Sequence, residues 1–158
     1  MTDNTIEIGG SVPDFELPAT GGDPIRLSTL LAQGPVVIYF YPKDDTAGCT
    51  TEGKDFTARH DAFRAAGVTV IGISRDSLKS HEKFKAKHGF PFELLADESE
   101  TVCEPFGVMK LKNMYGKQVR GIERSTFLID RDGILRREWR KVKVAGHVDE
   151  VLKAIDVL

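Results

Sequence analysis

The apolar positions of the chain fall into short continuous runs and into spaced patterns, which predicts buried strands together with amphipathic helices. Residues 36–41 and 68–74 are mainly β-branched, aromatic and small, as is typical of strands buried on both faces of an α/β sheet. Between them, apolar side chains recur at helical spacing, which predicts a helix over 49–66. A strand, a helix and a strand over so short a span indicate a parallel pair with a right-handed crossover.

The remaining patterns predict smaller elements around this βαβ unit. The turn-rich first 35 residues predict short strands or a hairpin around 14–17 and 25–27. Further along we expect a helix from the capping candidates Asp76 and Ser77 to Gly89, a short helix after the capping box at 97–100, a surface loop over 110–123, a hairpin around Asp130–Gly133 and a C-terminal helix carrying Val148, Val151 and Ile155. This order predicts one α/β domain over residues 1–158, with a mixed central sheet flanked by helices.

Composition fits this prediction and excludes several classes of function. The chain has 158 residues, 41% hydrophobic and 29% charged, which is ordinary for a globular protein. A net charge of -2 gives no electrostatic reason to expect a nucleic-acid or membrane partner. No apolar run approaches the length of a membrane span, and residues 1–7 lack the pattern of a secretory signal, so we expect a cytoplasmic protein.

The two cysteines, Cys49 and Cys103, are too few and too far apart for a disulfide scaffold, a C-x-x-C pair or a zinc knuckle. Cys49 falls in the first turn of the predicted helix, where free backbone N–H groups and the helix dipole favour a thiolate. Full ionisation of an ordinary thiol raises the fraction present as thiolate, the nucleophile, only about 30-fold at neutral pH. Most of a catalytic rate would therefore come from groups that polarise the target. From the residues alone, a reactive Cys49 and a cysteine packed as a small hydrophobe both stay open.

Other chemistries find little support. A phosphatase loop needs an arginine six positions after its cysteine, where this chain has Asp55. No H-E-x-x-H pair occurs, so we expect no metal, and His81 and His88 are interpreted as solvated. No glycine-rich phosphate-binding motif is present, and we expect no cofactor.

The segment from Pro42 to Cys49 matches the P-x-x-x-T-x-x-C signature of the peroxiredoxins, and Gly48-Cys49-Thr50-x-Glu52 resembles their Q-type branch, the bacterioferritin comigratory proteins. The similarity continues through 102–108 and 122–130 and covers the chain from about Pro13. This resemblance implies a thioredoxin-like fold with an N-terminal β-hairpin extension. It also implies a thiol-dependent peroxidase that reduces hydrogen peroxide and organic hydroperoxides.

The resemblance also implies roles for individual residues. Cys49 would be the peroxidatic cysteine, which attacks the peroxide and becomes a sulfenic acid. Thr46 would hydrogen-bond the peroxide and the sulfur, Pro42 would shield the site from water, and Arg124 would favour the thiolate and hold the peroxide oxygens. Taken singly, each also fits a structural role: a turn or cap residue, a strand terminator and a surface arginine. Glu52 is expected to orient the loop or cap the helix.

The chain departs from its relatives at the resolving cysteine. The two positions where Q-type members carry it are here Lys54 and Lys85. We therefore predict a one-cysteine cycle in which thioredoxin, glutaredoxin or glutathione reduces Cys49. Cys103 is expected to be structural, with a role as resolving cysteine through local unfolding as the alternative.

Two other functions stay open at this stage. One is a different thiol enzyme of the same fold, such as a glutathione peroxidase-like or disulfide-exchange protein. The other is a non-catalytic binding module with an inert cysteine. The resemblance also implies a monomer.

Overall fold

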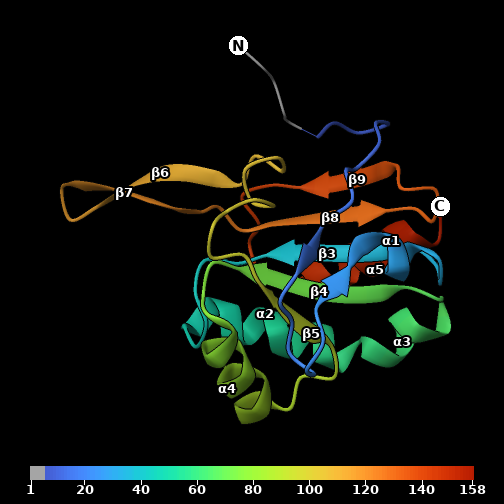
Figure 1. Ribbon diagram of the computed structural model, residues 1–158, viewed down its shortest axis with the longest axis horizontal. Helices are drawn as coiled ribbons and strands as arrows, with labels where there is room; N and C mark the ends of the chain where they lie inside the picture. The colour runs from blue at the N-terminus through green and yellow to red at the C-terminus, as the bar shows by residue number, and fades with distance from the viewer. Residues whose placement is uncertain (1–5) are drawn as a thin grey trace.

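The computed structural model describes residues 6–158 (Figure 1). The first five residues, which form most of the segment checked for a secretory signal, lie outside this range. Among the described residues, no helix is both long and apolar enough to cross a membrane.

A five-stranded mixed sheet forms the centre of the molecule (Figure 1). Its strands lie in the spatial order β5 (Glu93–Ala96), β4 (Thr69–Ser74), β3 (Val36–Phe40), β8 (Ser125–Ile129) and β9 (Leu135–Trp139). β3, β4 and β5 are parallel, whereas β8 and β9 are antiparallel to their neighbours. Every residue of β3 is buried, which confirms the prediction of a central strand from its continuous apolar run.

The sheet separates two hydrophobic clusters because successive side chains of a strand point to opposite faces. Val36, Ile38 and Phe40 belong to one cluster, and Val37 and Tyr39 to the other. The second cluster lies under α2 (Ala47–Ala58), α3 (His60–Ala65), α4 (Leu78–His88) and α5 (His147–Ile155). The first lies under α1 (Leu27–Leu31), the N-terminal hairpin of β1 (Glu16–Leu17) and β2 (Ile25–Arg26), and the segment 102–108.

Several predicted elements are confirmed. α4 begins after Ser77, whose hydroxyl accepts from the N–H of Ser80, and ends at Gly89 in the left-handed conformation. The hairpin around 130–133 joins β8 to β9, and the C-terminal pattern forms α5. The N-terminal hairpin extension is present as β1 and β2.

Three predictions were wrong in detail. The helix predicted over 49–66 is two helices, because the backbone leaves helical geometry at Arg59. The short helix expected after residue 97 is a series of turns, in which the Asp97 carboxylate accepts from the N–H groups of Val102 and Cys103. The loop expected over 110–123 is a β-hairpin of β6 (Met109–Met114) and β7 (Lys117–Ile122) that extends away from the sheet (Figure 1).

Candidate active site

Cys49 lies in the first turn of α2, directly after the loop that leaves β3. Thr46 is the N-cap residue, and its carbonyl accepts the first helical hydrogen bond, from the N–H of Thr50 at 2.9 Å. The first turn of a helix has unpaired N–H groups and the positive end of the helix dipole, and both favour a thiolate at this position. Cys49 is only 1% exposed and packs in the cluster beneath the helices.

Arg124 brings its guanidinium to this sulfur from the start of β8, on the other side of the site. Its Nη2 donates to Sγ of Cys49 at 3.3 Å, and its Nη1 donates to Oε1 of Glu52 at 2.6 Å. Gly48 makes this approach possible, because a Cβ at that position would lie 3.0 Å from Nη2. The structure therefore brings together the cysteine and the arginine that the sequence comparison indicated.

Glu52 is a site residue whose partner the sequence analysis missed. Its side chain is fully buried, Oε1 pairs with Arg124, and Oε2 has no hydrogen-bond partner among residues 6–158. Burial raises the pKa of Glu52 to about 7, although Arg124 acts to lower it. Burial also acts to lower the pKa of Arg124, but the charges of Glu52 and Cys49 outweigh it and raise this pKa. The guanidinium thus stays positive and divides its charge between two neighbours.

Thr46 and Pro42 precede Cys49 along the chain, and among the described residues neither of them forms a hydrogen bond with the sulfur. The Thr46 hydroxyl donates to the carbonyl oxygen of Lys43 at 2.9 Å, so its lone pairs point elsewhere and are available to accept. Thr46 is exposed and Pro42 is partly buried, as residues at the mouth of a site would be.

Cys103 lies outside this arrangement. It is fully buried in the cluster on the opposite face of the sheet from Cys49. Burial raises the pKa of the Cys103 thiol well above its ordinary range, and the Asp97 carboxylate raises it further. Both effects keep the thiol protonated and unreactive.

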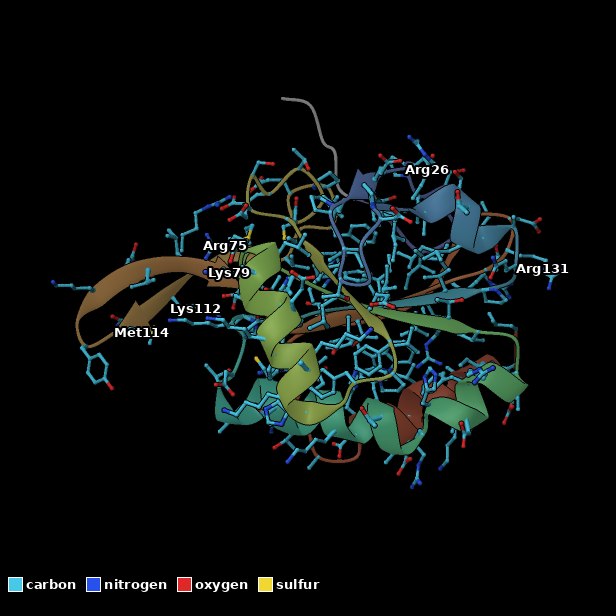
Figure 2. The ribbon with its side chains drawn as sticks, turned by 60° about the horizontal axis from the view of Figure 1, so that its bottom comes forward. Arg26, Arg75, Lys79, Lys112, Met114 and Arg131 are labelled. Carbon is cyan, nitrogen blue, oxygen red and sulfur yellow. The ribbon has the colours of Figure 1, made fainter. Side chains whose placement is uncertain are left out.

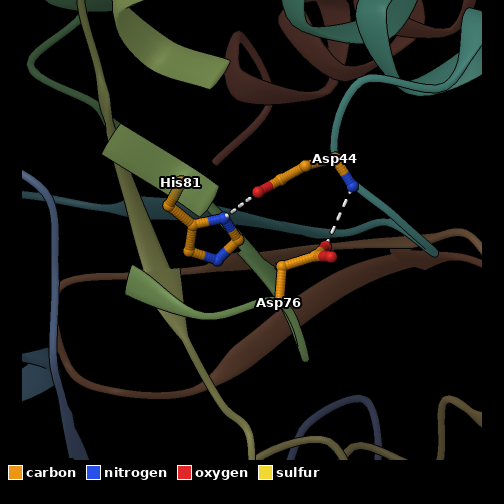
Figure 3. A group of neighbouring side chains, drawn as sticks. All are labelled: Asp44, Asp76 and His81. Atoms are coloured by element: carbon orange, nitrogen blue, oxygen red, sulfur yellow. Dashed lines mark hydrogen bonds and ion pairs between the residues drawn. The ribbon is translucent and has the colours of Figure 1, made fainter. Parts of the chain in front are cut away.

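A second polar cluster fixes the loop that carries the site (Figure 3). The Asp44 carboxylate lies 2.7 Å from Nδ1 of His81 and accepts from the hydroxyls of Tyr41 and Ser80. The N–H of Asp44 donates to Asp76 at 2.9 Å.

His81 is fully buried, so its interpretation as a solvated side chain was wrong. Nε2 of His81 lies 2.9 Å from the carbonyl oxygen of Leu95, which only accepts, so this nitrogen carries its proton. Asp44, Asp76 and His81 approach one another closely enough to hold a metal, yet protein groups already engage their polar atoms. We interpret the cluster as a hydrogen-bond network that joins the loop to α4 and β5.

Comparison with known proteins assigns the family. Residues 8–138 match the family model described as the AhpC/TSA family. Peroxiredoxin Bcp of Xanthomonas campestris is 52% identical over 98% of this chain and 96% of its own length. Peroxiredoxin Bcp of Bacillus subtilis is 50% identical over 96% of each chain.

The chain is a peroxiredoxin.

Solved structures agree with this assignment and confirm the thioredoxin-like fold. A structure of Xanthomonas campestris peroxiredoxin Q matches this peroxiredoxin with a TM-score of 0.88 and 52% identity, over 99% of this chain and 98% of the other. A structure described under the alkyl peroxide reduction activity of the Xanthomonas protein matches with a TM-score of 0.85 and 53% identity, over 90% of each chain. The peroxiredoxin is therefore a thiol-dependent peroxidase of the Q-type branch.

Proposed function

We propose that this peroxiredoxin reduces hydrogen peroxide and organic hydroperoxides in a one-cysteine cycle at Cys49, with the second thiol supplied from outside the chain. The separation of the two cysteines by the central sheet carries this proposal. A disulfide needs its two Cα atoms within about 7 Å, and Cys49 and Cys103 pack in separate hydrophobic clusters on opposite faces of the central sheet.

The positions where relatives carry a resolving cysteine support the same cycle. The two cysteines replaced by serine in structures of the Xanthomonas protein are spaced as Cys49 and Lys85 are in this chain. Here Nζ of Lys85 pairs with Oε1 of Glu93 at 2.6 Å, so the residue ties α4 to β5 instead. Lys54 is an exposed residue of α2.

In the first step the Cys49 thiolate attacks one oxygen of the peroxide. An S–O bond forms as the O–O bond breaks, and the leaving oxygen departs with the electron pair and takes up a proton as water or an alcohol. Negative charge moves from sulfur toward oxygen, along the side where Arg124 and the helix N–H groups lie. Fixed positive charge in this place stabilises the transition state more than the ground state. Thr46 accepts a hydrogen bond from the peroxide O–H through its free lone pairs, and Pro42 limits access of water.

The second half of the cycle needs two thiols. One attacks the sulfenic sulfur, so that an S–S bond forms and the oxygen leaves as water. The second breaks this mixed disulfide, which restores the Cys49 thiol and leaves the two external sulfurs joined. Thioredoxin, glutaredoxin and two molecules of glutathione each supply the required pair of electrons.

Peroxide consumption by the wild type, Cys49→Ser and Cys103→Ser tests this function. We expect Cys49→Ser to lose turnover and Cys103→Ser, the matched control, to keep it with an external thiol. Mass spectrometry after one equivalent of peroxide should show one added oxygen on Cys49, or a mixed disulfide once thiol is added. A Cys49–Cys103 disulfide in the oxidised wild type would contradict the one-cysteine cycle.

A further inference from the structure

Exposed apolar side chains are concentrated on the hairpin of β6 and β7. It projects beyond the sheet (Figure 1). It carries most of the large apolar side chains that the described residues leave exposed: Leu111 at 67%, Met114 at 49%, Tyr115 at 101% and Val119 at 44%. A cluster of exposed apolar side chains on one element marks an interaction surface.

All charged residues of the hairpin are basic. Its basic residues are Lys110, Lys112, Lys117 and Arg120, and residues 109–122 contain no Asp or Glu. Arg120 is neutralised by Glu100 and Glu104 of the neighbouring turn segment. Over the described residues 6–158, none of the three lysines forms an ion pair.

Strand register places the unpaired lysines on one face with two of the apolar side chains. Lys112 lies opposite Val119, and Met114 lies opposite Lys117, so these four share a face with Lys110. Arg120, held by its glutamates, lies opposite Leu111 on the other face. We call the first set, Lys110, Lys112, Met114, Lys117 and Val119, the hairpin face.

The hairpin face adjoins the active site at its base. Nζ of Lys112 donates to the carbonyl oxygen of Ile122, two residues before Arg124. Burial lowers the pKa of Lys112 and the charge of Arg124 lowers it further, while Glu123 and Cys49 act to raise it. Figure 2 shows Lys112 nearer the body of the molecule and Met114 farther out along the hairpin. The face therefore runs outward from the surroundings of Cys49.

The base of the hairpin is fixed to the body. Nη2 of Arg75 donates to the carbonyl oxygen of Arg120 at 3.1 Å, and Nη1 of the same guanidinium donates to Glu100 at 3.0 Å. A partner that binds the hairpin is thus held at a set position relative to Cys49.

We propose that the hairpin face is the docking surface for an acidic protein dithiol that reduces oxidised Cys49. This rests on the proposed one-cysteine cycle, which requires an external thiol. Apolar side chains between lysines suit an apolar partner surface rimmed by carboxylates. Two copies of this face would bring their lysines into one interface with no carboxylate from either hairpin, which disfavours a second copy as the occupant. Because Cys49 is only 1% exposed, the docked thiol reaches Sγ when the first turn of α2 opens beside it.

Steady-state peroxidase assays with an acidic thioredoxin, its reductase and NADPH test the proposal in the full chain. The variants are Lys110→Glu/Lys117→Glu and Met114→Thr/Val119→Thr, the latter chosen because threonine keeps strand propensity. Leu111→Thr on the opposite face is the apolar control. Lys143→Glu/Lys153→Glu, two exposed lysines elsewhere, is the charge control.

We expect each hairpin-face variant to raise the KM for thioredoxin at least about fivefold while kcat changes little, since rim charges and small apolar anchors act on encounter and docking. The rate of turnover with dithiothreitol and the rate of Cys49 oxidation in a single turnover should both match those of the wild type. Matching rates would also show that the variants fold. Added salt should weaken thioredoxin binding less in Lys110→Glu/Lys117→Glu than in the wild type.

A thioredoxin KM within about twofold of the wild type in both hairpin variants would overturn the proposal. An equal rise in the control variants would also overturn it, as would a wild type that thioredoxin reduces no faster than dithiothreitol does. If sedimentation shows that the wild type forms a dimer and the hairpin-face variants do not, while the KM for thioredoxin is unchanged, the face binds a second copy of this chain instead. Failure of the one-cysteine cycle has a different signature, because it appears as a Cys49–Cys103 disulfide or as lost dithiothreitol turnover in Cys103→Ser.

Discussion

Arg124 serves two negative neighbours, and the balance between them depends on the protonation of Glu52. Nη1 lies 2.6 Å from the carboxylate and Nη2 lies 3.3 Å from the Cys49 sulfur. When Glu52 is protonated, the guanidinium charge is directed to the sulfur alone. When it is ionised, the carboxylate competes for that charge.

The buried Glu52 should make stability depend on pH. Its pKa is about 7 in the folded protein and 4.5 ordinarily, so the folded state holds this proton more tightly. The resulting stabilisation is complete below pH 4.5 and is lost as the pH rises to about 7, a decline of about 3 kcal/mol. Urea unfolding between pH 4.5 and 8 should show this decline in the wild type and not in Glu52→Gln. Equal pH slopes in the two proteins would contradict the assignment.

Gly48 leaves the space through which Arg124 reaches the sulfur. In Gly48→Ala the new Cβ meets Nη2 at 3.0 Å, so the guanidinium has to move by a few tenths of an ångström. We expect the rate of Cys49 oxidation to fall about fivefold, equivalent to about 1 kcal/mol of transition-state stabilisation. Alanine is the better helix former, so stability should be kept or increased. Stopped-flow oxidation and thermal unfolding separate the two effects, and a rate equal to the wild type would show that this space is not needed.

The sequence could predict part of this site and not the rest. Cys49, Thr46 and Pro42 lie close together in a motif, and resemblance identified Arg124. The contact of Glu52 with Arg124 joins residues 72 positions apart, and only the fold creates it. The expected role of Glu52 in orienting the loop or capping the helix stays a prediction, and its burial could not be inferred from an acidic residue in a helix.

His81 connects helix α4 to the active-site loop through its contact with Asp44 (Figure 3). Removal of the imidazole leaves the buried Asp44 carboxylate without its contact to Nδ1 and removes a donor to the Leu95 carbonyl. We expect His81→Phe to lose about 3 kcal/mol of stability. Its loop around residues 42–46 should also be cleaved faster by proteases. Urea unfolding and limited proteolysis measure these effects.

His60→Phe is a matched control, because this histidine lies outside the network on α3. Wild-type stability in His81→Phe would contradict a fastening role for the histidine.

The three mistaken elements have different causes. The alternation of apolar and polar residues over 109–114 and the Tyr115–Gly116 turn, with positive φ at both residues, are typical of a hairpin. The segment was interpreted as a loop because it is polar and contains glycine, and most of its side chains are exposed in the structure. Neither glycine nor proline marks the break at Arg59. At Asp97 the carboxylate binds backbone N–H groups as a helix cap would, but Glu100 adopts a left-handed conformation and ends the turn.

Across the molecule, the protection of backbone amides against hydrogen exchange should follow the burial of the two hydrophobic clusters on the sheet. β3 and β8 are buried along their whole length, whereas the outer part of β6 and β7 is exposed. Hydrogen exchange should therefore be slowest in β3 and β8, near the limit of global unfolding, and fastest in the hairpin tip. Mass spectrometry of peptides sampled over time measures this order. Slow exchange at residues 112–119 in the isolated protein would contradict it and would indicate that the hairpin is already covered.

The fold class and the central βαβ unit could be predicted from the sequence because they follow from local periodicity. Strand β5 was not predicted, and β6 and β7 were predicted as a loop. The placement of two cysteines on opposite faces of one sheet could not, because it depends on which cluster each loop joins.

That placement has a consequence for oxidative stress. In the proposed one-cysteine cycle, the sulfenic acid of Cys49 waits for an external thiol, and a second peroxide competes with that thiol to form a sulfinic acid. The outcome depends on the ratio of peroxide to reductant in the surroundings, not on the enzyme alone. In such a cycle, a shortage of external reductant leads to irreversible inactivation of the enzyme.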